Sequence, residues 1–142
     1  MKVFYYCRTG KYAALLAAAL HIKSLPINLP FNQFLSYIKT INLKSYEPFF
    51  LGEDHNGTKV YVVGTRTEEK LVATIIKSFV HTFITDDKNV LVINSLPNPN
   101  FFLICILKLN ALGIIKYFFQ SLIPYAVWLN RKAIQNYIYN PN

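Results

Sequence analysis

The chain has 142 residues, a length that suits one ordinary domain with a sizeable core, and we expect residues 1–142 to form a single unit. Lysine and arginine outnumber aspartate and glutamate by 15 to 7, giving a net charge of +8, but the basic residues are scattered singly. Because nucleic-acid binding needs a basic stripe and a recognition motif is absent, this composition argues against nucleic acid as a partner.

The first thirty residues predict a strand, a tight basic loop and an alanine-rich helix. Apolar residues from Lys2 to Tyr6 form the strand, and the helix is expected over 12–23. A loop that closes onto a helix N-terminus presents unpaired backbone N–H groups and the positive end of the helix dipole. Positive charge from Arg8 and Lys11, together with Thr9 and Gly10, makes this loop a candidate anion-binding site.

The next segment predicts a helix, a hairpin and a second helix. Prolines at 26 and 30 interrupt the chain, and apolar residues at helical spacing follow from Phe31 to about Asn42. Residues 49–51 and 60–63 flank an Asn-Gly pair, which predicts a β-hairpin. The Thr65 to Glu68 spacing is typical of a capping box, so we expect a helix over 66–84.

An apolar run over residues 90–93 is typical of a central strand covered on both sides. If it runs parallel to the first strand, Asn94 and Ser95 face the same crevice as the Cys7–Lys11 loop, with Tyr12 at its edge. We therefore predict a three-layer α/β domain, with a small mixed sheet and helices on both faces.

The C-terminal part is strongly apolar. We expect a helix from Phe101 to a cap at Gly113, a short strand over 114–119 and a last helix over 125–139. Its uninterrupted apolar stretches fall short of the ~20 residues that a membrane span requires. Buried helices explain most of this region, and an exposed patch that meets a protein partner, a second copy or a membrane surface is the alternative.

Known chemical motifs are incomplete. Cys7 is a candidate nucleophile because a helix N-terminus and nearby cations lower a thiol pKa, but a phosphatase-type loop needs an arginine where Ala13 stands. A nucleotide-binding P-loop needs a glycine where Tyr5 stands and a hydroxyl residue where Tyr12 stands. A buried, inert cysteine and a loop that merely caps the helix are the structural alternatives.

Several other polar residues have structural explanations. The spacing of the histidines and cysteines gives no metal site, and no cofactor is expected. His21 is interpreted as a core or helix-end residue, and Asp54 as a brace of the hairpin turn. Trp128 and Arg131 could edge a pocket or belong to an amphipathic helix. Two cysteines do not make a disulfide framework, so we expect a reducing, cytoplasmic location.

Three blocks of sequence carry a resemblance to a known family. They are residues 6–10 followed by 17–21, residues 50–64, and residues 91–97 leading to Asn100. These blocks resemble an uncharacterised bacterial family, domain of unknown function 3189, found largely in spore-forming organisms. The family pattern places a second glycine, a histidine and serines where this chain has Thr9, Tyr12, Ala13 and Ala14, and its Gly-Gly and Ser-Arg-Arg stretch has no clear counterpart over 109–120. The resemblance implies a fold more than a function.

Two functions from different classes follow from the sequence. The first is a non-catalytic module that binds a small anion or a protein partner through the loop after the first strand. The second is a degenerate or unusual cysteine-dependent enzyme that acts on an anionic phosphate or carboxylate substrate through Cys7.

Overall fold

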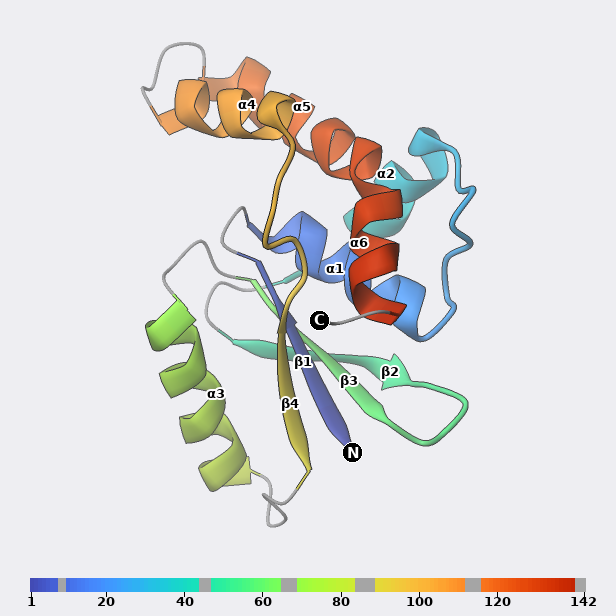
Figure 1. Ribbon diagram of the computed structural model, residues 1–142, viewed down its shortest axis with the longest axis vertical. Helices are drawn as coiled ribbons and strands as arrows, with labels where there is room; N and C mark the ends of the chain where they lie inside the picture. The colour runs from blue at the N-terminus through green and yellow to red at the C-terminus, as the bar shows by residue number, and fades with distance from the viewer. Residues whose placement is uncertain (8–9, 44–46, 65–68, 84–88, 112–115, 140–142) are drawn as a thin grey trace.

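The computed structural model, shown in Figure 1, describes residues 1–7, 10–43, 47–64, 69–83, 89–111 and 116–139. Within these ranges the chain forms four strands and six helices. In chain order they are β1 (Lys2–Tyr6), α1 (Lys11–His21), α2 (Phe31–Thr40), β2 (Pro48–Glu53), β3 (Lys59–Val63), α3 (Glu69–Phe83), β4 (Val90–Asn94), α4 (Phe101–Ala111), α5 (Lys116–Leu129) and α6 (Arg131–Tyr139).

The four strands form one mixed sheet in the order β2-β3-β1-β4. β1 pairs in parallel with both β3 and β4, and β2 pairs with β3 in an antiparallel hairpin. The parallel pairing of the first strand with the strand at 90–94 and the hairpin are both confirmed. The strand that is flanked on both sides by parallel neighbours is β1.

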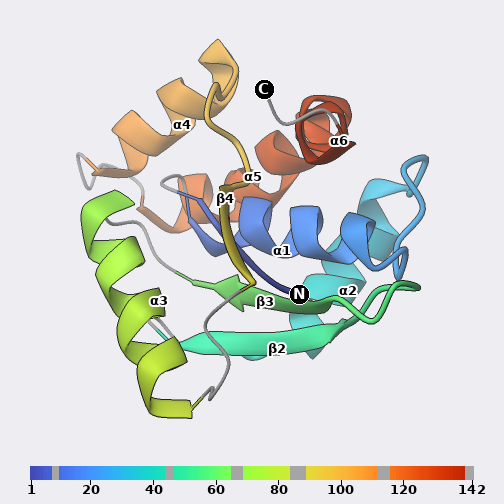
Figure 2. The same cartoon turned by 60° about the horizontal axis from the view of Figure 1, so that its bottom comes forward.

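Helices cover both faces of this sheet, as Figures 1 and 2 show. One face packs against α1, with α2, α4, α5 and α6 around it; we call these five helices the α1 layer. The other face packs against α3. The predicted three-layer α/β architecture is therefore confirmed.

The side chains of β1 alternate between the two cores. Val3 and Tyr5 pack into the core on the α1 side, whereas Phe4 and Tyr6 pack into the core on the α3 side. All four are almost completely buried. This double burial explains why the first strand is apolar on both faces, since parallel strands under helices have no solvent face.

Helix α1 lies between the sheet and the outer helices. Its residues from Ala13 to Leu20 are all buried, as the absence of a polar stripe in the sequence predicts. The helix contacts β1 and β3 on one side and α5 and α6 on the other. The small alanine side chains let both layers approach it.

The prediction that residues 90–93 form a central strand is wrong. β4 lies at the edge of the sheet, and the side chains of Leu91 and Val92 are 46% and 39% exposed. An uninterrupted apolar run does not distinguish a covered central strand from an edge strand, because both contain the same β-forming residues.

Two C-terminal predictions are also wrong. Residues 116–119, expected within a short strand, form the first turn of α5, and the expected single helix over 125–139 is divided at Asn130 between α5 and α6. The side-chain Nδ2 of Asn130 donates to the Ala126 carbonyl oxygen at 2.7 Å. The backbone carbonyl oxygen of Asn130 accepts from Ile134 N at 3.0 Å. Asn130 thus closes one helix and opens the next.

Some predictions fall on residues that are not described. The cap at Gly113, residues 114 and 115 of the expected strand, and the capping residues Thr65 and Glu68 lie outside the described residues. In the part of the chain that is described, no helix is both long and apolar enough to cross a membrane.

Candidate functional site

The loop after β1 turns sharply into α1. Gly10 N donates to the Cys7 carbonyl oxygen at 3.0 Å, which closes a tight turn at the end of the strand. Gly10 is buried and has φ of 117°, a conformation that favours glycine over residues with a side chain. The glycine therefore permits the chain to leave the sheet and enter the helix at once.

The N-terminus of α1 has no side-chain cap from Gly10 and no acidic residue in its first turn. Its first residue, Lys11, is exposed, with its Nζ atom 5.7 Å from the centroid of the half-buried Tyr12 ring. Arg8 and Thr9, the other predicted loop residues, lie outside the described residues. The described part of the loop keeps the positive electrostatic character that the sequence indicates.

Ser95 joins the end of β4 to the end of β1. Its backbone N–H and its Oγ both donate to the Tyr6 carbonyl oxygen, at 2.7 and 2.9 Å. Asn94 pairs in register with Tyr6, and its Oδ1 accepts weakly from Leu96 N at 3.4 Å. The carboxyl ends of β1 and β4 therefore lie side by side, as predicted. The buried Ser95 hydroxyl links them.

The helices that follow β1 and β3 in the chain pack on opposite faces of the sheet. β1 leads into α1 on one face, and β3, which ends at Val63, leads toward α3 on the other, as Figure 1 shows. In open α/β sheets, ligands bind where neighbouring connections diverge in this way, outside the carboxyl ends of the strands. The turn at Cys7 and Gly10 follows the carboxyl end of β1, where Tyr6 pairs with Val63 of β3.

Cys7, the predicted nucleophile, has no exposed surface and packs into the core on the α1 side. Cys105 on α4 is half-buried, and no disulfide joins the two. Cys7 thus takes part in the turn through its carbonyl oxygen, while its side chain packs into the interior.

A partly buried hydrogen-bonded chain links three elements that lie far apart in the sequence. The Tyr5 hydroxyl is 2.7 Å from His21 Nδ1, and His21 Nε2 is 3.2 Å from Asp54 Oδ2. Tyr5 lies on β1, His21 ends α1 and Asp54 opens the hairpin turn. The side chains of His21 and Asp54 are only 19% and 6% exposed. We call this set the Tyr–His–Asp chain.

No sequence motif indicates the Tyr–His–Asp chain. The expectation that Asp54 braces the hairpin is correct, since its Oδ1 accepts from the backbone N–H groups of Asn56 and Thr58, each at 2.8 Å. His21 is indeed at a helix end. No spacing rule connects residues 5, 21 and 54, because only the packing of α1 across the hairpin brings them together.

Hydrogen bonds and burial shift the pKa values of Asp54 and Tyr5 in opposite directions. Hydrogen bonds from the Thr58 and Asn56 backbone and from His21 lower the Asp54 pKa to about 2, against an opposing effect of burial. Burial, with smaller effects of Tyr139 and Asp54, raises the pKa of Tyr5 well above its usual value. The carboxylate is therefore ionised and can only accept hydrogen bonds, whereas the phenol is protonated and can donate one.

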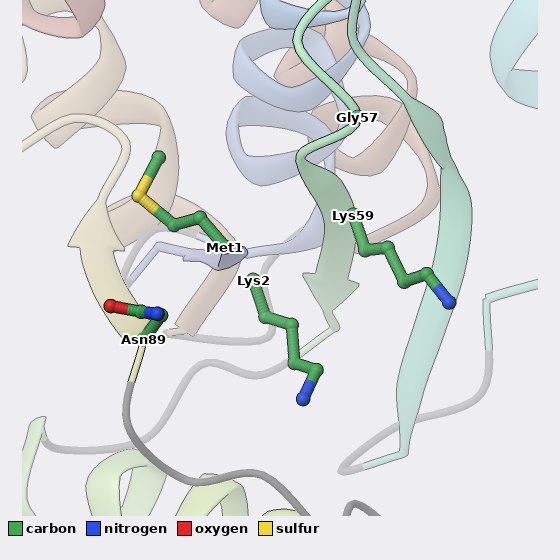
Figure 3. Close-up of a pocket in the computed structure, with 5 residues that line it drawn as sticks. All are labelled: Met1, Lys2, Gly57, Lys59 and Asn89. Carbon is green, nitrogen blue, oxygen red and sulfur yellow. The ribbon is translucent and has the colours of Figure 1, made fainter.

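A pocket lies at the opposite end of the sheet, where the parallel strands begin. Figure 3 shows its lining, formed by Met1, Lys2, Gly57, Lys59 and Asn89, and its volume is about 140 Å³. Backbone hydrogen bonds from Lys2 N to Asn89 O and from Lys59 N to Met1 O hold its walls together. It is formed at the amino ends of the parallel strands and is therefore separate from the Cys7–Lys11 loop.

Trp128 and Arg131 tie the C-terminal helices to the chain before α2. Trp128 Nε1 donates to the Leu29 carbonyl oxygen at 2.8 Å, and the Arg131 guanidinium lies 4.1 Å from the centroid of the Trp128 ring. Arg131 Nε also donates to the Ile27 carbonyl oxygen at 3.3 Å. Among the described residues, no group of three His, Cys, Asp or Glu side chains could hold a metal ion.

Comparison with known proteins gives a family and no activity. No curated protein and no solved structure shows significant similarity to the chain. A family model described as protein of unknown function, DUF3189, matches residues 2–137, which is nearly the whole sequence. The chain therefore belongs to the DUF3189 family of proteins of unknown function.

Proposed function

We propose that this chain is a binding module for a small anion bearing a phosphate or carboxylate group, and that the loop between β1 and α1 binds it. One observation carries the proposal. The N-terminus of α1 has neither a side-chain cap from Gly10 nor an acidic residue in its first turn, and it follows the carboxyl end of β1, an inner strand of the sheet.

An anion at this position would meet three favourable contributions. The first backbone N–H groups of a helix have no partner within the helix, and the helix dipole favours negative charge there. Lys11 and Arg8 would add side-chain cations, and the net charge of +8 favours the approach of anions to the whole molecule. Tyr12, Asn94 and Ser95 belong to the proposed edge of the site.

Binding without catalysis is the preferred form of the proposal, because a nucleophilic thiol must be reached by its substrate and the Cys7 side chain is fully buried. The cysteine-dependent enzyme acting on an anionic substrate remains the alternative. A protein partner or second copy at the apolar C-terminal half is supported by the exposed side chains of Phe101, Phe102 and Leu109. We also propose that the chain is located in the cytoplasm.

Thermal unfolding in the presence of phosphate or sulfate tests anion binding. A ligand that binds the folded chain alone raises the free energy of unfolding by about 1.4 kcal/mol at ten times its dissociation constant. We expect phosphate to raise Tm in a saturable way, and the double substitution Arg8→Ala/Lys11→Ala to abolish that rise. Sodium chloride at equal ionic strength measures general salt stabilisation.

A matched control is available on other helices. Lys39→Ala/Lys77→Ala removes the same number of charges from exposed positions on α2 and α3. This variant should keep the phosphate-induced rise in Tm. An equal rise in the parent, the loop variant and the control variant would reject the loop as a specific anion site.

A further inference from the structure

The outer edge of β4 presents backbone groups without a strand beside them. Lys2 N donates to Asn89 O, and Ser95 N donates to Tyr6 O, so residues 89, 91, 93 and 95 direct their backbone groups toward β1. Because successive residues of a strand alternate, Val90, Val92 and Asn94 direct their N–H and C=O groups outward. Within the described ranges, no strand lies beyond β4.

The two edges of the sheet differ in their protection against edge-to-edge pairing. The β2 edge begins with Pro48, has a break in register between Phe50 and Gly52, and ends at the charged Glu53. Prolines, bulges and charges are the devices that prevent a strand from pairing with another chain. β4 has none of them, since its sequence is Val-Leu-Val-Ile-Asn with an uninterrupted register to β1.

The side chains of β4 are also incompletely covered. Val90 packs partly on the α3-side core and Ile93 partly on the α1-side core. Between them, Leu91 is 46% exposed and Val92 is 39% exposed, one on each face of the sheet. Apolar surface therefore remains in water on both faces of the open edge.

We propose that β4 pairs with β4 of a second copy of this chain, in antiparallel orientation about a two-fold axis at Val92, so that two sheets become one. In this register Val92 exchanges both backbone hydrogen bonds with its symmetry mate, and Val90 pairs with Asn94 of the other copy. All the outward backbone groups of the strand are then satisfied. On the α1 face, Leu91 of each copy lies against Ile93 of the other.

A second copy is the occupant that this edge fits best, for two reasons. A two-fold interface must be self-complementary, and the alternation in β4 lets its three outward residues pair in one register, Val92 with Val92 and Val90 with Asn94. Two molecules with a charge of +8 repel each other, and β4 adds nothing to that repulsion because it carries no charged side chain. An edge selected for an acidic or basic partner would have the opposite charge on its side chains.

Amide hydrogen exchange of the unmodified full chain tests the proposal directly. The amides of Leu91 and Ile93 bond to β1 and should be protected at every protein concentration. The amides of Val90 and Val92 should be protected at high concentration and exchange faster on dilution, in step with the monomer–dimer equilibrium measured by sedimentation. Rapid exchange of Val92 at a concentration where the chain is dimeric would overturn the proposal.

Val92→Lys provides a second test, because the two-fold axis places the two introduced charges directly opposite each other. We expect its dimer dissociation constant to rise by about tenfold or more. Leu71→Lys is the matched control, since Leu71 on α3 is 48% exposed and belongs to neither proposed interface. It should leave dimerisation unchanged, whereas Leu109→Lys probes the apolar C-terminal half instead. A monomeric parent, or a dimer that Leu109→Lys dissociates and Val92→Lys does not, would contradict pairing through β4.

Discussion

At the scale of single residues, the Tyr–His–Asp chain is the least expected feature of the molecule. Tyr5 is completely buried, so its hydroxyl must be paired inside the protein, and His21 provides the partner at 2.7 Å. Asp54 in turn fixes the other imidazole nitrogen and the hairpin turn. Three residues thereby fasten the end of α1 to the central strand and to the hairpin.

His21→Ala and Tyr5→Phe separate the hydrogen bond from the cost of an unpaired hydroxyl. Tyr5→Phe alone should lower the free energy of unfolding by about 0.5–1.5 kcal/mol, the net contribution of one hydrogen bond. His21→Ala should cost about 1–3 kcal/mol, because the Tyr5 hydroxyl is then left buried and without this partner. In the His21→Ala background, Tyr5→Phe should therefore be stabilising. Urea unfolding at pH 7 measures all three variants, and simple additivity of the two losses would contradict the pairing.

The ionised Asp54 predicts a pH dependence of stability. Its pKa falls from 3.8 to about 2 on folding, so the folded state favours the charged form. The resulting stabilisation is complete above pH 3.8 and is lost as the pH falls through about 2. We expect the difference in free energy of unfolding between the parent and Asp54→Asn to be constant near neutral pH and to shrink as the pH falls from about 4 to 2.

A matched variant separates Asp54 from general acid effects. Glu53→Gln removes the same charge from the neighbouring residue, whose side chain is 49% exposed and 3.9 Å from Lys59 Nζ. An exposed ion pair contributes little to stability, so its curve should follow that of the parent. A difference for Asp54→Asn that stays constant down to pH 2 would show that the carboxylate is not stabilised by folding.

At the scale of elements, local signals predict those parts of the fold that depend on local interactions. The β1 strand, the hairpin and the helix at Phe31 lie within two residues of their expected bounds, because turn residues and apolar periodicity define them locally. The three-layer arrangement follows from the alternation of strands and helices in the first hundred residues. These features need no knowledge of which strands become neighbours.

The errors occur where the environment decides. The run at 90–93 is as apolar as a central strand, but its place at the edge depends on β3 pairing with β1 on the other side. Residues 116–119 have aromatic residues that favour a strand, yet they belong to a helix that packs against α4 and α1. Tertiary contacts decide the position of the first segment in the sheet and override the strand preference of the second.

The candidate site is predictable to a similar degree. The closeness of Ser95 to the end of β1 follows from the parallel pairing of β1 and β4. The orientation of a side chain does not follow, and the structure directs Cys7 into the core. The Tyr–His–Asp chain could not be found from the sequence, because it depends on contacts over 16 and 33 residues.

At the scale of the whole molecule, β1 connects two hydrophobic cores. The core on the α3 side contains Ile76. Trp128 on α5 packs against the core on the α1 side. Strand β1 contributes fully buried side chains to both. A loss of packing on one side should therefore be transmitted through this strand to the other.

This coupling predicts a single cooperative unfolding transition. Trp128 is the only tryptophan, so its fluorescence reports on the α1 layer, whereas far-UV circular dichroism reports on all helices. Ile76→Ala creates a cavity in the opposite core, because Ile76 is only 1% exposed, and should cost about 2–5 kcal/mol. At a protein concentration where the chain is monomeric, we expect this variant to lower the midpoint equally by fluorescence and by dichroism. Leu71→Ala, on the same helix at a side chain that is 48% exposed, should barely move either midpoint. If Ile76→Ala left the Trp128 transition in place while the dichroism changed, the two sides of the sheet would unfold independently, and residues 1–142 would not form one cooperative unit.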